Sequence, residues 1–238
     1  MAGFSLTKIK NLGIWGDSLL KGIVFDEKEG KYHPSKKSSV KLFEQMFPIQ
    51  IKNNSRFGCT APRALENLER SLDKGFSADA VLLEFGGNDC DFNWVEVSKH
   101  PDIEHQPHTP FAVFSGTMQK MVQVLKSHKI KPVLMNLPPI DSDRYFDWIA
   151  SLPGVDGDRV LFWLKEKNII YRQQELYSRA IEKLAYTEAL PLIDVRSQFL
   201  ELHDYRNYLC VDGIHLNELG QQRMSEVFSS FAKEYAIA

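Results

Sequence analysis

Short apolar runs alternate with amphipathic helical segments along the chain, and this alternation constrains the fold more than any other feature. Each run is only a few residues long and most end at Gly, Asn or Pro, as buried strands do. We therefore predict strands at residues 9–15, 49–52, 80–85, 131–137 and 190–195.

The segments between these runs carry apolar residues at helical spacing. Thr60 and Thr109 are each followed by a proline in the first turn of a helix, and Asn217 is a candidate N-cap for the last helix. We predict helices over residues 39–47, 60–75, 109–125, 158–167 and 171–187 and after Asn217. The segments 90–108 and 138–156 are predicted as long loops.

Strands that alternate with helices favour a mostly parallel sheet covered by helices on both faces. No linker interrupts the pattern, so we expect one domain over residues 1–238. Sheets of this kind place their sites just beyond the carboxyl ends of the strands. Those ends fall at residues 16–18, 53–58 and 86–89 and in the loop after Leu137.

Ser18 follows the first predicted strand in the sequence Gly16-Asp17-Ser18-Leu19. A serine in such a place often caps a helix. It can also be a nucleophile held at a strand-to-helix turn, where the helix N-terminus favours an oxyanion. In that second interpretation the hydroxyl needs a base.

Asp212 and His215 form the sequence Asp212-Gly213-Ile214-His215 before the last helix. Their three-residue spacing lets both side chains point the same way in a turn. Asp212 then accepts from one imidazole nitrogen, and the other nitrogen takes the proton of Ser18. A surface turn with an incidental histidine is the alternative for this tetrapeptide alone.

Candidate donors for an oxyanion also stand at strand ends. Asn88 lies in Gly86-Gly87-Asn88-Asp89, and Gly58 offers a backbone N–H where a side chain would crowd a substrate. Such residues also form simple turns. Chance explains the whole set poorly, because Gly-Asp-Ser-Leu alone occurs about once in a thousand chains of this length.

These motifs resemble those of the SGNH, or GDSL, hydrolase family, and the resemblance runs from Trp15 to the helix after His215. The family's serine, glycine, asparagine and histidine blocks match residues 14–19, 53–58, 86–89 and 212–215. The resemblance implies an α/β fold, a flavodoxin-like three-layer α/β/α sandwich with a five-stranded parallel sheet. Leu216 departs from the proline that often follows the histidine, which removes a stiff turn element but no reacting group.

The resemblance further implies a serine esterase or acylhydrolase with a covalent acyl-enzyme. In it Ser18 is the nucleophile, His215 the base and Asp212 the residue that orients the base. The oxyanion hole then consists of the N–H groups of Ser18 and Gly58 and the side chain of Asn88. No cofactor and no metal is implied.

The motifs do not select a substrate, because the family includes lipases, lysophospholipases, thioesterases and carbohydrate deacetylases. We expect an esterase for a small or carbohydrate-linked acyl group. A lysophospholipase or thioesterase for lipid acyl groups is one alternative. A catalytically silent binding module is another, and the complete motif set argues against it.

Aromatic residues gather after the fourth predicted strand, where a site is expected. We predict that Tyr145, Phe146 and Trp148 line the acyl or leaving-group pocket from an Asp-rich loop, since flat rings suit a sugar face or a short acyl chain. Arg144 is predicted to hold an acidic group of the substrate. The aspartates around these rings argue against a long apolar acyl channel.

Charge and hydropathy exclude several other classes of protein. Lys and Arg total 29 against 31 Asp and Glu, a net charge of −2, so there is no basic excess to match a phosphate backbone. No apolar run approaches the roughly 20 residues of a membrane span, and the start lacks the apolar core of a signal peptide. We expect a cytoplasmic protein that does not bind nucleic acid; the sequence leaves its oligomeric state open.

Three other groups of residues have structural explanations. Each cysteine lies within two residues of a site motif, and we interpret all three as small apolar packing: Cys59, Cys90 and Cys210. Three histidines share a loop, but their spacing fits no helix face, so a solvated loop is favoured over a metal site: His100, His105 and His108. Glu84, inside the third predicted strand, is predicted to be a structural carboxylate with a partner.

Overall fold

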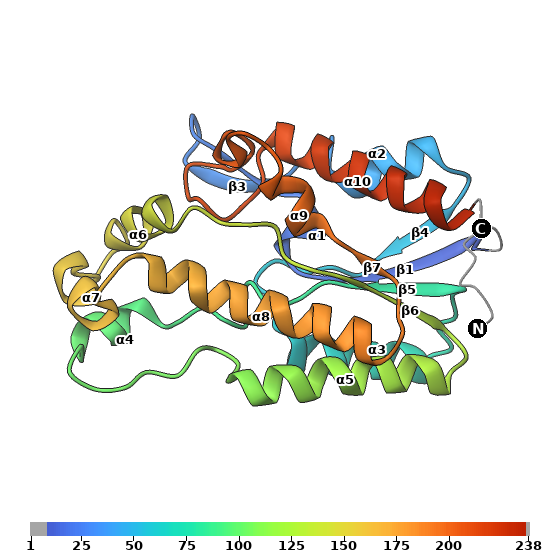
Figure 1. Ribbon diagram of the computed structural model, residues 1–238, viewed down its shortest axis with the longest axis horizontal. Helices are drawn as coiled ribbons and strands as arrows, with labels where there is room; N and C mark the ends of the chain where they lie inside the picture. The colour runs from blue at the N-terminus through green and yellow to red at the C-terminus, as the bar shows by residue number, and fades with distance from the viewer. Residues whose placement is uncertain (1–8, 237–238) are drawn as a thin grey trace.

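The computed structural model describes residues 9–236, and a five-stranded sheet forms its centre (Figure 1). The strands are β1 (Asn11–Trp15), β4 (Gln50–Asn53), β5 (Ala80–Leu83), β6 (Lys131–Met135) and β7 (Leu192–Ile193). They lie in the order β4-β1-β5-β6-β7, and all neighbours are parallel. The five predicted strands are therefore present in the flavodoxin-like order, and the predicted fold class is confirmed.

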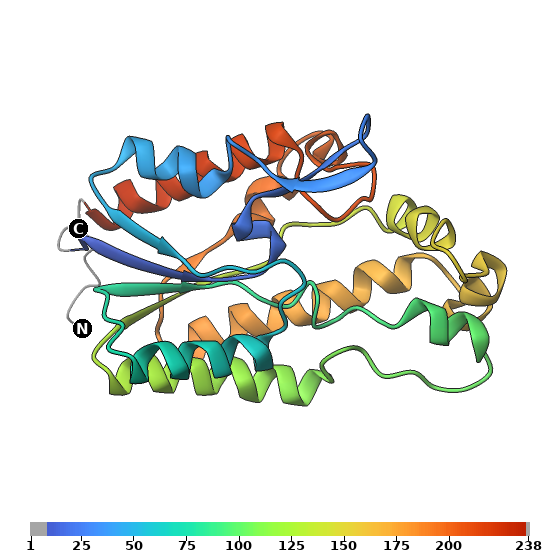
Figure 2. The ribbon, with the colours of Figure 1, turned by 180° about the vertical axis from the view of Figure 1, so that it is seen from behind.

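Helices cover both faces of the sheet, as Figures 1 and 2 show. One face carries α3 (Ala61–Asp73), α5 (Phe111–Ser127) and α8 (Asn168–Thr187), and the other carries α2 (Ser39–Met46) and α10 (Glu218–Ala236). Because successive side chains of a strand point to opposite faces, Val81 and Leu83 of β5 enter the first core layer and Leu82 enters the second. Burial on both faces explains why β5 is an unbroken apolar run.

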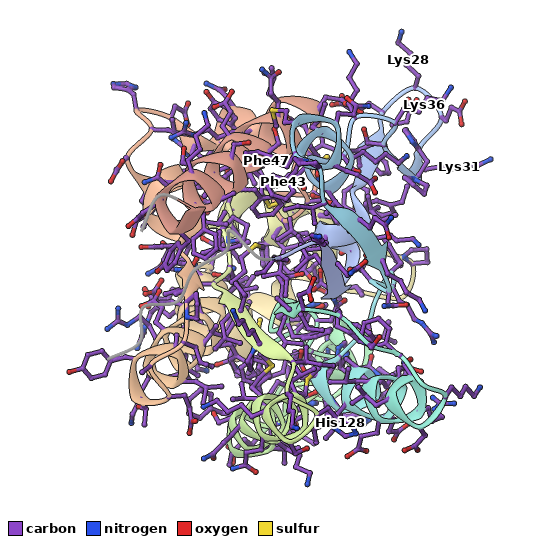
Figure 3. All side chains as sticks on the ribbon, turned by 90° about the vertical axis from the view of Figure 1, so that its right-hand side faces the viewer. Lys28, Lys31, Lys36, Phe43, Phe47 and His128 are labelled. Carbon is purple, nitrogen blue, oxygen red and sulfur yellow. The ribbon has the colours of Figure 1, made fainter. Side chains whose placement is uncertain are left out.

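Apolar packing between helix and sheet is visible at the end of the molecule shown in Figure 3. Phe43 of α2 and Phe47 just after it stack with ring centroids 4.7 Å apart and contact the core layer between α2, α10 and the sheet. Burying a side chain such as Phe43 contributes about 1.5 to 3 kcal/mol relative to leaving it exposed. This layer holds β1 and α10 together; Ser18 follows the first of these elements, and His215 precedes the second.

A lobe of three short helices extends beyond the carboxyl ends of the strands, at the left of Figure 1. It contains α4 (Trp94–Lys99), α6 (Ser142–Ala150) and α7 (Gly157–Leu164). Their apolar side chains form a third core with Ile140 and Ile170. The lobe covers the edge of the sheet at which ligand sites of this architecture lie.

The prediction of long loops was wrong where α4 and α6 form. Asn93 caps α4 by accepting from the N–H of Glu96, and Asp141 caps α6 by accepting from the N–H groups of Asp143 and Arg144. Each helix is shorter than three turns and rich in aromatic residues, which have modest helix propensity. The apolar repeat is therefore too short to be recognised without the caps.

An antiparallel hairpin that the sequence analysis did not predict follows the short helix α1 (Ser18–Lys21). It pairs β2 (Ile23–Asp26) with β3 (Lys31–Pro34). Asp26 holds the turn by accepting from the N–H groups of Lys28 and Glu29. Figure 3 shows Lys28, Lys31 and Lys36 extending away from the body of the protein.

The chain after β7 forms α9 (Val195–Leu200), a 3-10 helix (Tyr205–Tyr208) and α10. Asn217 caps α10 as predicted, since its Oδ1 accepts from the N–H of Gly220 at 3.0 Å. A β-bridge between Leu209 and Leu216 closes the turn that contains Asp212 and His215. Within residues 9–236, no helix combines the length and the hydropathy needed to cross a membrane.

Candidate active site

Ser18 is the first residue of α1, and only Gly16 and Asp17 separate it from the end of β1 at Trp15. Asp17, not Ser18, caps this helix, because the Asp17 carboxylate accepts from the N–H of Leu19 at 2.8 Å. The Ser18 hydroxyl bonds instead to His215. Ser18 is therefore not the N-cap of α1. The turn from strand to helix lies at the predicted position, between β1 and α1.

Gly213 gives the turn between Asp212 and His215 its shape. Its φ is 74°, and a Cβ at this position would lie 2.6 Å from the backbone oxygen of Asp141. Only glycine fits such a place. Asp212 Oδ1 accepts from the N–H groups of Ile214 and His215, both at 3.0 Å, so the turn brings the Asp212 and His215 side chains together.

Asp212, His215 and Ser18 form one hydrogen-bonded chain. Asp212 Oδ2 lies 2.7 Å from His215 Nδ1, and His215 Nε2 lies 2.9 Å from Ser18 Oγ. These partners assign the Nδ1–H tautomer to a neutral imidazole, which leaves Nε2 to accept from the hydroxyl. Burial raises the pKa of Asp212, but the hydrogen bond and positive charge offered by His215 outweigh burial and lower the pKa overall.

The candidate oxyanion donors lie around Ser18. Asn88 shares a cavity with Ser18, and its Nδ2 donates to Asp17 Oδ2 at 2.8 Å. Gly58 ends a loop that is tied to the serine turn, since the N–H of Arg56 donates to the Gly16 carbonyl. The φ of Gly58 is 66°, a conformation that favours glycine without any crowding by the protein.

Two buried carboxyl groups beneath Ser18 were not recognised as part of the site. Asp17 orients Asn88, and Glu84 accepts from the N–H of Asp17 at 3.3 Å. Burial raises the pKa of Asp17, and burial together with the charge of Asp17 raises the pKa of Glu84 well above its ordinary value. The protonated form of Glu84 is thereby favoured, which avoids two like charges next to Ser18.

The cavity beside Ser18 has a volume of about 100 Å³ and lies between the sheet edge and the lobe. Its wall is largely apolar and includes Phe92, Trp94, Leu137, Ile140, Ile170 and Ile214. Asp91 lies in the wall with both carboxylate oxygens occupied, by Tyr145 Oη at 2.7 Å and Trp94 Nε1 at 2.9 Å. The cavity therefore offers an apolar space that opens onto Ser18.

Of the four residues predicted to form the substrate pocket, one lines the cavity beside Ser18 and three have other surroundings. They lie on or at α6 rather than in a loop, and only Tyr145 lines the cavity beside Ser18. Phe146 is buried in the core of the lobe, and Trp148 packs against Phe25 with ring centroids 4.9 Å apart. Arg144 pairs with Asp141 and donates to a backbone oxygen. The charge of Arg144 is thus partnered outside the cavity, and its role in holding a substrate acid stays a prediction.

The three cysteines are buried and free. Cys59 and Cys90 pack in the core under α3 and α5, whereas Cys210 Sγ accepts from the N–H of Phe25 at 3.4 Å. Burial raises the pKa of Cys210 to about 11, so the thiol is uncharged at neutral pH. Among residues 9–236, no group of three or more His, Cys, Asp and Glu side chains is placed to hold a metal ion.

Fold and site together define a class of protein: a three-layer α/β domain with a Ser–His–Asp hydrogen-bonded chain at the carboxyl edge of its parallel sheet. The model of the GDSL-like lipase/acylhydrolase family matches residues 14–223. The chain therefore belongs to this family.

Similar proteins agree with this assignment. A GDSL esterase/lipase of Arabidopsis thaliana is 22% identical over 182 residues, which cover 75% of this chain and 64% of that relative. The lipase/acylhydrolase from Enterococcus faecalis has a TM-score of 0.66 at 17% identity, over 95% of this chain and 96% of its own. An acetylxylan esterase from Geobacillus stearothermophilus has a TM-score of 0.62 at 16% identity, over 94% of both chains. At these identities the structural likeness concerns the fold.

Proposed function

We propose that the protein is a serine esterase that transfers a short acyl group first to Ser18 and then to water. The observation that carries this proposal is the hydrogen-bonded chain from Ser18 through His215 to Asp212, with distances of 2.9 and 2.7 Å. In this chain the imidazole lies between the hydroxyl and the carboxylate, so it can take the proton of the hydroxyl while the carboxylate stabilises its charge.

The reaction proceeds in two halves. Ser18 Oγ attacks the ester carbonyl carbon while its proton passes to His215 Nε2, and Asp212 stabilises the resulting imidazolium. The tetrahedral oxyanion is stabilised by the N–H groups of Ser18 and Gly58 and by the Asn88 side chain. The bond to the alcohol breaks, and the alcohol leaves with the proton from His215. Water then attacks the acyl-serine, gives its proton to His215, and the acid departs as the Ser18 hydroxyl is restored.

The volume of the cavity supports a short acyl group. About 100 Å³ is less than the roughly 150 Å³ of an apolar cavity that binds benzene, so acyl chains of about two to four carbons fit best. The surrounding aspartates do not bear on the length of the acyl chain, because Asp141 caps α6 and Asp147 pairs with Lys167. Cavity size therefore replaces charge as the reason to favour small acyl groups over lipid ones.

The leaving group is proposed to lie on the open side of His215, next to Phe57. The Phe57 ring is parallel to the His215 ring, with an interplanar angle of 3° and centroids 6.0 Å apart, and 54% of the residue is exposed. His215 must reach the leaving oxygen to protonate it, so the rest of the alcohol passes this ring. An exposed flat ring suits the face of a sugar, which favours a carbohydrate-linked acyl ester. The fold shared with an acetylxylan esterase is compatible with such a substrate.

A panel of esters tests the proposal. We expect hydrolysis of acetyl and butyryl esters, including acetylated xylooligosaccharides, with kcat/KM at least about tenfold higher for acetyl than for octanoyl 4-nitrophenyl ester. Ser18→Ala should be inactive, and Ser39→Ala, which alters another buried serine at the start of a helix, should retain wild-type activity. Preference for octanoyl esters, lysophospholipids or acyl thioesters would instead support the lipid-directed alternative. No turnover of any ester would support a silent binding module.

A further inference from the structure

The hairpin of β2 and β3 places Tyr32 at the Asp212 end of the Ser18–His215–Asp212 chain. Tyr32 Oη donates to Asp212 Oδ2 at 2.7 Å, and this is the same carboxylate oxygen that bonds to His215 Nδ1 at 2.7 Å. The Tyr32 and His215 rings also touch, with centroids 4.9 Å apart. Tyr32 does not line the cavity beside Ser18, and its ring also packs on Phe57, with centroids 5.5 Å apart.

The register of the hairpin explains why the hydroxyl arrives there. Phe25 and Tyr32 are opposite each other in the antiparallel pair, so their side chains lie on one face, with ring centroids 5.0 Å apart. Trp148 of α6 packs on both rings, and the N–H of Phe25 donates to Cys210 Sγ. The hairpin is thus attached both to the lobe and to the segment that leads into Asp212.

We propose that Tyr32 is a positioning residue for the base: its hydroxyl fixes the Asp212 oxygen that binds His215 and limits how strongly that carboxylate retains a proton on the imidazole. This inference rests on the proposed function. The carboxylate of Asp212 is an acceptor only, so the phenol is the donor. Four hydrogen bonds, two to each oxygen, then hold a carboxylate that is fully buried.

The electrostatic effect of Tyr32 has a definite sign. Its hydrogen bond contributes to lowering the pKa of Asp212, and burial together with the Asp212 charge raises the pKa of Tyr32, which keeps the phenol protonated. A carboxylate with one donor fewer binds an imidazolium more strongly. Loss of the hydroxyl should therefore make the protonated, inactive base persist to higher pH.

Other titratable groups face this chain and are shared by wild type and variant. Asp17 lies on the serine side, with Glu84 behind it, and Cys210 lies on the Asp212 side. From α6, Arg144 is paired with Asp141. None of these groups is altered by removing the Tyr32 hydroxyl, so a difference between the two pH profiles reports on the Tyr32–Asp212 bond.

The test compares Tyr32→Phe with wild type in kcat, KM and the pH profile of kcat/KM. We expect kcat to fall about tenfold with KM changed less than twofold, since the lost bond is to a charged group that acts on the base. The acid limb of the profile should move to higher pH by a few tenths of a unit. Tyr205→Phe is the matched control, because it removes a hydroxyl that donates to the Ile140 carbonyl at 3.1 Å; its acid limb should not move.

Two further measurements separate positioning from support of the fold. In an Asp212→Asn background, Tyr32→Phe should cause little additional loss of kcat, because the partner through which it acts is already changed. The low-field proton resonance of His215 Nδ1–H should shift in Tyr32→Phe and not in Tyr205→Phe. The inference would be overturned if Tyr32→Phe had the wild-type kcat and pH profile. It would also be overturned if Tyr32→Phe lowered kcat as much in the Asp212→Asn background as in wild type. Full activity of Ser18→Ala in the same assay would instead overturn the proposed function.

Discussion

The amide of Asn88 shows how one side chain serves two partners. One of its two N–H bonds is directed at Asp17 Oδ2, which fixes the orientation of the side chain; the other is available to an oxyanion. Asp17 in turn is held by its bond to the N–H of Leu19. The residue that caps α1 therefore also sets the position of the candidate oxyanion donor.

At this residue scale we expect Asn88→Ala to lower kcat by about 100-fold while KM changes little, because an oxyanion donor acts chiefly in the transition state. Asn54→Ala is a matched control, since the Asn54 side chain donates to the Lys52 carbonyl in β4 and the variant should retain kcat. Steady-state kinetics with an acetyl ester measure both. A rise in KM with unchanged kcat would show that Asn88 binds substrate instead.

Among the elements, α8 joins the body of the protein to the lobe. Its first turn contributes Ile170 to the cavity wall, while Ile181, three turns further on, is buried in the core layer shared with α3 and α5. One helix therefore carries both a residue that limits the cavity and a residue that only packs. This arrangement allows cavity size to be changed separately from stability.

We expect Ile170→Ala to enlarge the cavity and raise the ratio of octanoyl to acetyl kcat/KM by about tenfold, as a few methylene groups do in apolar pockets. Ile181→Ala should leave the ratio unchanged, although both variants lose roughly 2 to 5 kcal/mol of stability. The ratio is measured by steady-state kinetics at a temperature at which circular dichroism shows both variants to be folded. Equal ratios in the two variants would mean that the acyl chain does not occupy this cavity.

For the molecule as a whole, buried carboxyl groups make stability depend on pH. Burial raises the pKa of Asp89 from 3.8 to about 6, although the Ala61 N–H and the Thr109 side chain oppose the shift. A raised pKa in the folded state means that the folded protein binds the proton more tightly than the unfolded chain does. The associated stability is complete below about pH 4 and is lost as the pH rises through about 6.

Asp89→Asn removes this titration. The free energy of unfolding of the variant minus that of wild type should therefore rise by on the order of 2 kcal/mol between pH 4 and pH 7. Urea unfolding at several pH values measures the difference, with Asp143→Asn on the exposed side of α6 as the control. A difference that is constant with pH would contradict the assignment of a raised pKa to Asp89.

The parts of the fold that could be predicted are those with long or repeated signals. Buried runs such as β5 and long stripes such as that of α5 determine the sheet and its two helical layers. The hairpin was missed because the charged turn at residues 27–30 separates two strands of only four residues each. The helix α6 was missed because nine residues are too few for an apolar repeat to stand out.

The same distinction applies to the candidate site. Ser18, Asp212 and His215 stand in contiguous motifs, so their types and order were sufficient to select them. Tyr32 reaches Asp212 across 180 residues of sequence, and local patterns carry no information about such a contact. The cavity wall likewise combines several elements, so the sequence of one segment does not reveal that Tyr145 lines the cavity while Trp148 packs on Phe25.

Covalent labelling of Ser18 tests the central claim most directly. A fluorophosphonate forms a bond to an activated serine oxygen and releases fluoride. Wild type and Ser39→Ala should each gain the mass of one probe less HF, peptide mapping should locate the adduct on Ser18, and Ser18→Ala should gain none. Labelling of Ser18→Ala at the wild-type rate, or an ester-hydrolysing wild type that is never labelled at Ser18, would contradict the account.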